Sequence, residues 1–152
     1  MDEAFLKEAV DLSQQSVDTG GYPVGSLVVH KGEVVGRGFS NGKVLCDATS
    51  HAEIAAIRDA SQKLGVRNLD DCILYSSMEP CVMCLMACSW AYISKICFAC
   101  EKSKVMARFC EGEHDNKALN AAMYKPLEYV YLDDYQEEVL SIINKWENSL
   151  KK

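Results

Sequence analysis

The chain has 152 residues, of which 49% are hydrophobic and 25% are charged, a balance typical of a globular protein with its own core. No stretch approaches the roughly 20 apolar residues of a membrane-spanning helix, and the formal net charge of -6 disfavours a broad nucleic-acid-binding surface. We therefore expect a single domain over residues 1–152, with no membrane span.

The eight cysteines could indicate either a disulfide framework or a set of free thiols and metal ligands. The sequence starts with Met1-Asp2-Glu3 and has no basic segment followed by an apolar one, as a secretory signal would. We therefore expect a cytoplasmic protein whose cysteines are reduced or bind metal.

Hydrophobic periodicity predicts the order helix, strand, strand, helix, strand, helix, strand, short helix, strand, helix. Residues 41–50 are predicted to form a polar loop, and Asp133 is predicted to cap the last helix. Helices between strands cover both faces of one sheet, which indicates a three-layer α/β/α domain. The predicted ranges are 2–17, 24–30, 34–39, 51–64, 72–76, 81–92, 96–99, 105–109, 128–132 and a helix from residue 133 onward.

One motif lies at the predicted start of the second helix, where Ser50 is followed by His51, Ala52 and Glu53. Ser50 and Glu53 have the spacing of a capping box, in which the glutamate only stabilises the helix end. That interpretation would suffice for Glu53 if the sequence contained no metal ligands elsewhere.

The second motif, Pro80-Cys81-Val82-Met83-Cys84, supplies two thiols at a predicted helix start. Cys81 and Cys84 share one face of the first helical turn, where the helix N-terminus favours thiolates. Together with His51 they make three zinc ligands, which leaves one coordination position open for an activated water. Glu53 is then placed to move protons, and this H-x-E and P-C-x-x-C pattern is that of zinc-dependent nucleobase deaminases.

A second C-x-x-C, Cys97-Phe98-Ala99-Cys100, raises the alternatives of a four-cysteine structural zinc site and of a redox pair. The segment is predicted to be a strand, on which residues three apart face opposite sides and chelate poorly. The structural alternative also leaves His51 and Glu53 unexplained.

These residues resemble the cytidine-deaminase-fold zinc enzymes of the His-Ala-Glu branch, which includes guanine, fungal-type cytosine and tRNA adenosine deaminases. The resemblance covers nearly the whole chain and is strongest over residues 51–58 and 69–101. It implies that His51, Cys81 and Cys84 bind Zn²⁺ and that Glu53 transfers protons. It also implies a five-stranded mixed sheet and a homodimer.

Within the branch, residues 51–58, residues 69–75 and Trp90-Ala91 look most like bacterial guanine deaminases, whereas Pro23-Val24-Gly25 looks more like tRNA adenosine and cytosine deaminases. By this resemblance Trp90 would lie near the base. The other expected substrate contacts are Ser40 or Asn41, Asp47 and Ala52.

Two positions depart from the branch. Ser40 stands where an asparagine usually binds the substrate, with Asn41 next to it. Lys104 stands where guanine deaminases place an acidic residue, and a lysine cannot accept a hydrogen bond.

We expect hydrolytic deamination of a small nucleobase-like substrate, with a guanine-like purine ahead of cytosine. A tRNA adenosine deaminase is one alternative, but it needs a basic groove, and Lys102, Lys104 and Arg108 form only a small cluster. A non-enzymatic, zinc-stabilised interaction domain is the other alternative.

Overall fold

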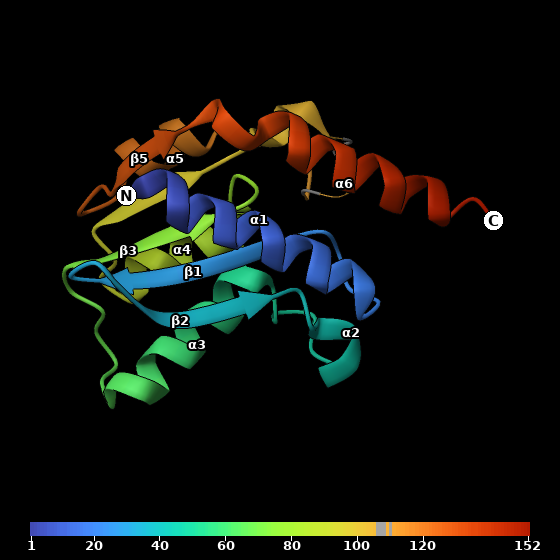
Figure 1. Cartoon of the computed structure of the whole chain (residues 1–152). Helices are drawn as coiled ribbons and strands as arrows, with labels where there is room; N and C mark the ends of the chain where they lie inside the picture. Colours follow the sequence, from blue (N-terminus) through green and yellow to red (C-terminus); the bar gives the residue numbers. More distant parts are fainter. Residues whose placement is uncertain (106–108, 110) are drawn as a thin grey trace.

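A five-stranded mixed sheet forms the centre of the computed structural model, which describes residues 1–105, 109 and 111–152 (Figure 1). The strand order is β2-β1-β3-β4-β5; β1 is antiparallel to both β2 and β3, and β3, β4 and β5 are mutually parallel. The strands are β1 (Gly25–His30), β2 (Glu33–Phe39), β3 (Cys72–Ser76), β4 (Lys95–Phe98) and β5 (Glu128–Tyr131).

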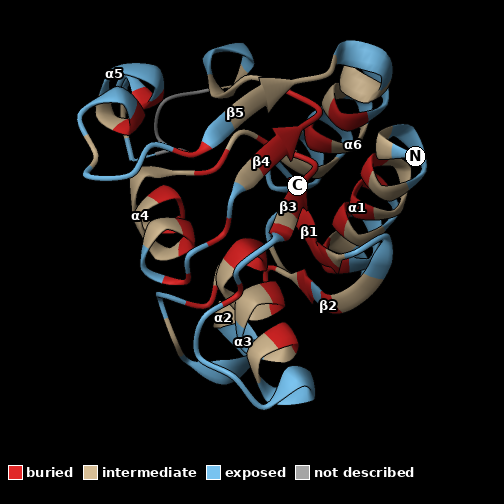
Figure 2. Cartoon of the chain, turned by 90° about the vertical axis from the view of Figure 1, so that its left-hand side faces the viewer, coloured by how far each residue is buried: buried red, intermediate tan, exposed pale blue. Residues whose placement is uncertain are grey.

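Helices cover both faces of this sheet, with α1 and α6 on one side and α3 and α4 on the other (Figure 2). The predicted three-layer architecture and mixed sheet are therefore confirmed. The helices are α1 (Asp2–Asp18), α2 (Gly42–Leu45), α3 (Ala52–Leu64), α4 (Val82–Trp90), α5 (Asn116–Ala121) and α6 (Gln136–Ser149), with 3-10 turns at Lys102–Lys104 and Asp133–Tyr135.

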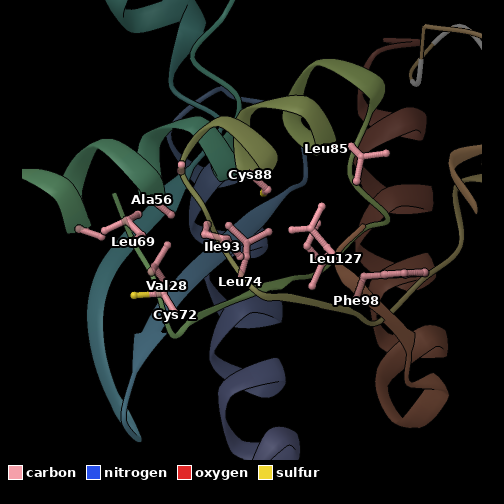
Figure 3. Packing of buried hydrophobic residues seen from close by; sticks show 13 residues of the cluster. Val28, Ala56, Leu69, Cys72, Leu74, Leu85, Cys88, Ile93, Phe98 and Leu127 are labelled. Carbon is pink, nitrogen blue, oxygen red and sulfur yellow. The ribbon is translucent and has the colours of Figure 1, made fainter. Parts of the chain in front are cut away.

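The core has two layers, because successive residues of a strand face opposite sides of the sheet. On β1, Leu27 and Val29 pack toward α1 and α6, whereas Val28 packs toward α3 and α4. Figure 3 shows the second layer, in which Leu85 and Cys88 of α4 lie over the sheet. The site-bearing helices are thus fixed by continuous apolar packing.

Close approach of α3 to β2 depends on two glycines of the strand. A Cβ at Gly38 would overlap the Ala52 carbonyl oxygen and the Ala56 backbone nitrogen, and one at Gly36 would overlap the Ala56 carbonyl oxygen and Ala60. The start of α3, where the first motif lies, therefore rests directly on the backbone of β2.

Several predicted details are wrong. Part of the expected 41–50 loop forms α2, and α5 was not predicted at all. Asp133 does not cap α6; it opens a 3-10 turn, and α6 begins after Tyr135 without a side-chain cap. The helix expected over 105–109 falls mainly on residues 106–108, outside the described residues.

The described part of the chain contains no helix with the length and hydropathy to span a membrane. Among the cysteines of this part, Cys46, Cys72, Cys81, Cys84, Cys88 and Cys97 are free thiols.

Candidate metal centre and active site

The two motifs meet because each places a ligand at the N-terminus of a helix. His51 is the N-cap residue of α3, and Cys81 is the N-cap residue of α4, which follows β3. Both residues have extended backbone conformations, and their carbonyl oxygens accept the first helical hydrogen bonds, from Ala55 and Leu85. The partial positive charge of two helix ends is therefore directed at one point.

The three predicted ligands form a compact group. Nδ1 of His51 lies 3.5 Å from Sγ of Cys81 and 3.6 Å from Sγ of Cys84, and all three ligand atoms lie within 4.8 Å of one another. A tetrahedral zinc ion about 2.3 Å from sulfur and about 2.0 Å from nitrogen holds such atoms about 3.5 Å apart. The donor set and its spacing therefore fit zinc.

The thiols are also electronically suited to a cation. The hydrogen bond from Cys84 lowers the pKa of Cys81 to about 4, while the same bond and burial raise the pKa of Cys84. The hydrogen bond with Cys81 raises the pKa of His51, against the effect of burial. One thiolate is thus present beside the imidazole before a metal binds.

Glu53 lies in the first turn of α3 and is only 3% exposed. Its Oε2 lies 3.4 Å from Sγ of Cys84. Burial raises the pKa of Glu53 to about 7. A carboxyl group with this pKa can both accept and donate a proton near neutral pH.

The capping-box interpretation of Glu53 is wrong. The N-cap is His51 instead of Ser50, and its side chain makes no capping hydrogen bond. The Ser50 hydroxyl instead donates to Oδ1 of Asn41, at 2.5 Å. Ser50 and Glu53 therefore do not form a capping box, and the Glu53 carboxylate contacts the ligand Cys84.

A cavity of about 920 Å³ opens over this group. His51, Glu53 and Cys81 line it, together with Met78 and Met83. Its size falls within the range of small-molecule sites. A substrate bound in this cavity would contact both the metal ligands and the buried carboxylate.

The structure brings most of the predicted substrate contacts to this cavity. Ser40, Asp47 and Ala52 line it, and Ser40 is 7% exposed. Asn41 lies instead in a smaller neighbouring depression, where Ser50 holds its side chain. Of the two alternatives at this position, Ser40 is the residue that faces the cavity.

Asp47 is held in place by the loop before α3. Its Oδ1 accepts hydrogen bonds from the backbone N–H and the hydroxyl of Thr49, and these lower the pKa of the Asp47 carboxyl. Arg58 of α3 forms an ion pair with Oδ2 at 3.3 Å. Asp47 thus stays ionised at the cavity wall.

Trp90 is not brought to this cavity. It is the last residue of α4, is 73% exposed and is absent from the described cavity lining. Lys104, in the 3-10 turn, also lies outside the described lining. Neither side chain contacts the site within this chain.

Sequence reasoning missed Glu111 and Trp146, which both line the cavity. Glu111 is an acidic group on the Cys81 side, where its Oε1 accepts from the backbone N–H of Val82 at 3.1 Å. The sequence indicated a role for Glu111 only through its position among several acidic residues that follow Lys104. Trp146 comes from α6, whose contact with the site depends on the tertiary fold alone.

The four-cysteine alternative finds no support in the geometry. Cys97 and Cys100 are buried in the hydrophobic layer under α1 and α6. Among the described residues, His51, Cys81 and Cys84 are the only group of three or more potential ligands close enough to share an ion.

The sequence of residues 1–100 matches the family described as the cytidine and deoxycytidylate deaminase zinc-binding region. The guanine deaminase of Bacillus subtilis (strain 168) is 38% identical over 154 residues, covering 99% of this chain and 96% of the relative. A tRNA-specific adenosine deaminase of Aquifex aeolicus (strain VF5) is 36% identical over 64% of either chain.

A solved structure of a guanine deaminase from Nitrosomonas europaea has a TM-score of 0.86 at 21% identity, covering 96% of this chain and 84% of that one. Because the identity is only 21%, this similarity supports the assignment of the fold alone. The family match, the full-length relative and the ligand geometry agree: this chain belongs to the zinc-binding cytidine and deoxycytidylate deaminase family and is a hydrolytic deaminase that acts on a C–N bond.

Proposed function

We propose that this chain hydrolyses the exocyclic amine of a free, guanine-like purine base and releases ammonia. The observation that carries the proposal is the buried carboxylate of Glu53, which contacts the ligand Cys84 at the floor of a cavity of base-binding size. The full-length similarity to a guanine deaminase supports the choice of base.

His51, Cys81 and Cys84 would hold a zinc ion through one nitrogen and two sulfurs. When bound, zinc supplies a water whose pKa is lowered to near 7. The two thiolates would neutralise the charge of the dication. A metal centre with no net charge would not bind the nearby carboxylate of Glu53 as a fourth ligand as strongly as a cation would.

Glu53 performs the proton transfers. It takes a proton from the attacking water and delivers it to the ring nitrogen beside the amine-bearing carbon. After the C–O bond has formed, Glu53 carries the remaining proton of the added hydroxyl group to the amine. The C–N bond then breaks, ammonia leaves and the oxygen remains as a carbonyl. Its burial keeps the carboxyl close to the substrate and away from bulk water.

Recognition of a guanine-like edge is assigned to Glu111 and Ser40. Guanine carries ring N–H groups besides the amine that leaves, and a carboxylate such as that of Glu111 can accept from them. Ser40 adds a hydroxyl that donates or accepts from the buried wall. Glu111 thereby fulfils the acceptor role that Lys104 cannot.

Helix α6 favours a free base over an RNA chain. Its Trp146 packs against Tyr22 and Phe109, with ring centroids 5.4 and 5.0 Å apart, and all three side chains line the cavity. These rings form an apolar wall, which can pack against a planar base but offers no positive charge to a phosphate backbone. The net charge of -6 also differs from the positive charge that is typical of RNA-binding domains.

The experiment is ammonia release by the zinc-loaded protein from guanine, isoguanine, adenine, cytosine, pterins, nucleosides and a tRNA anticodon stem-loop. We expect turnover of guanine or a closely related purine. Turnover of the stem-loop alone would favour the RNA-editing alternative, and no ammonia from any compound would overturn the proposal. If no compound releases ammonia and the Glu53→Ala variant keeps its zinc and its fold, the alternative of a zinc-stabilised interaction domain would be favoured.

We also propose that the chain forms a cytoplasmic homodimer. Trp90 and Tyr92 are 73% and 47% exposed at the end of α4, where a partner could bury them. The free thiols are consistent with a reducing compartment. Light scattering should give twice the mass of one chain, and a mass equal to that of one chain would contradict the dimer.

A further inference from the structure

A hydrogen-bonded polar network lies against the Glu79-Pro80-Cys81 turn. It is formed by Glu79, Lys102, Asn116 and Tyr129, which come from four separate segments. Polar groups removed from water stabilise a fold only when they are paired, so a satisfied network of this kind fixes one local geometry.

Asn116, the first residue of α5, is the centre of the network and is 2% exposed. Its Nδ2 donates to the carbonyl oxygen of Pro80 at 2.6 Å and to the hydroxyl of Tyr129 at 3.1 Å. Its Oδ1 accepts from Nζ of Lys102 at 2.9 Å. Both amide protons and the carbonyl are thus engaged.

Glu79 is bound at both carboxylate oxygens. Oε1 accepts from the hydroxyl of Tyr129 at 2.9 Å, and Oε2 accepts from the backbone N–H of Lys102 at 3.1 Å. Burial raises the pKa of Tyr129, so its phenol stays protonated and able to donate. Hydrogen bonds therefore hold the side chain of Glu79 as well as the carbonyl group of the next residue, Pro80.

The peptide group on the other side of Cys81 is also held. The backbone N–H of Val82 donates to Oε1 of Glu111 at 3.1 Å, and Nζ of Lys102 lies 3.9 Å from the same oxygen. Lys102 therefore connects the two side chains, Asn116 and Glu111, that bind the peptides flanking Cys81.

We propose that Asn116 is a positioning residue of the metal centre, which orients the Cys81 thiolate by fixing the carbonyl of Pro80. Asn116 touches neither the cavity nor a ligand side chain; it acts through the backbone of the turn. The inference rests on the proposed zinc site and deepens it, because residues beyond β4 then set the ligand geometry.

The chain offers a matched control on the same helix. Asn120 is also a buried asparagine of α5, but its amide bonds only the backbone of Leu127, at 2.8 and 2.9 Å. Asn116→Ala and Asn120→Ala therefore remove the same side chain from the same helix, and only the former removes a bond to the metal turn.

Zinc affinity is measured by competition with a chromophoric chelator, and ligand geometry by the thiolate-to-metal and d–d bands of the Co²⁺-loaded protein. We expect Asn116→Ala to weaken zinc binding by about tenfold or more, as for other residues that orient metal ligands, and to shift the Co²⁺ bands. Asn120→Ala should lower thermal stability but keep both signals.

If Asn116→Ala does not fold, a second pair of variants tests the positioning role of Asn116. Tyr129→Phe removes the hydroxyl that joins Asn116 to Glu79, while Tyr131→Phe removes a hydroxyl that bonds Gln136. Both rings pack on Phe98, so the packing change is matched. Only Tyr129→Phe should change the Co²⁺ spectrum.

Wild-type zinc affinity and Co²⁺ bands in Asn116→Ala would overturn the inference, as would equal losses in Asn120→Ala. These readouts need no substrate, so they separate the two proposals. If no base is deaminated but Asn116→Ala still weakens zinc binding, the positioning role stands and the proposed substrate fails. If guanine is turned over and zinc binding is unchanged, only the positioning role fails.

Discussion

Sγ of Cys84 lies 3.4 Å from Oε2 of Glu53, and this contact joins the first turns of α4 and α3. This contact brings together two residues that are 31 positions apart in the sequence. It fixes the carboxylate beside the metal ligands without making it a member of the three-residue ligand group.

Replacing Glu53 should separate metal binding from catalysis. Glu53→Gln keeps the shape of the side chain but removes its capacity to accept a proton, so turnover should fall by at least about 100-fold. Zinc content, measured by atomic emission, should stay at that of the wild type. Wild-type turnover in this variant would exclude Glu53 as the proton-transfer group.

Two buried cysteines of α4 should differ sharply in their effect on metal content. Cys84 belongs to the ligand group, whereas Cys88, one turn later, belongs to the hydrophobic layer against the sheet. Cys84→Ala should abolish stoichiometric zinc binding, and Cys88→Ala should retain it. If the two variants lose zinc equally, the assignment of the ligands is wrong.

Removal of the metal should reversibly stop the reaction. Dialysis against a strong chelator should abolish ammonia release, and added Zn²⁺ should restore it, because His51, Cys81 and Cys84 are the group that fits the ion. Circular dichroism before and after dialysis controls for unfolding. Full activity of a demonstrably metal-free preparation would contradict this mechanism.

Packing of α3 on β2 should be intolerant of a single added methyl group. Gly38→Ala would force the Ala52 carbonyl away from the strand, which should cost about 1–3 kcal/mol of unfolding free energy. Urea denaturation measures this cost. Glu33→Ala, at the exposed start of the same strand, is the control and should change stability little.

Acid should remove one specific contribution to stability. Burial raises the pKa of Asp59, but hydrogen bonds from Lys63 and from the backbone N–H of Arg37 outweigh it, and the pKa is lowered overall. A carboxyl with a lowered pKa stabilises the fold above its unfolded-state pKa, and this contribution is lost as pH falls through the lower, folded-state value.

Asp59→Asn should therefore be less stable than the wild type at pH 7, and the difference should shrink below about pH 4. Urea denaturation at pH 7, 5 and 3 measures it. Lys63→Met should reproduce part of the loss at pH 7. A difference that stays constant from pH 7 to pH 3 would show that ionisation of Asp59 contributes nothing.

The regular elements were predictable where local patterns are strong. The alternating strands and the long helices α1, α3 and α6 were recovered to within a few residues. Helix α5 has only six residues, and its N-cap, Asp115, lies in a polar stretch without hydrophobic periodicity. Helix α2 is shorter still, so neither carries a readable pattern.

The metal ligands were predictable because their chemistry leaves a spacing in the sequence, and the fold brings His51 and Cys81 together as expected. The cavity wall was less predictable. Glu111 and Trp146 reach the site through tertiary packing alone, while Trp90 is exposed and does not line the cavity. Local sequence patterns indicate which residues can bind a metal. They do not indicate which side chains from distant parts of the sequence will line the cavity.

Because only the folded chain gathers His51, Cys81 and Cys84 at one point, zinc binds the native state in preference to the unfolded one. The availability of the free ion therefore enters the folding equilibrium by mass action, and the melting temperature should rise with its concentration. In a zinc-starved cell, scarcity of the metal would thus reduce the lifetime of the protein as well as its turnover.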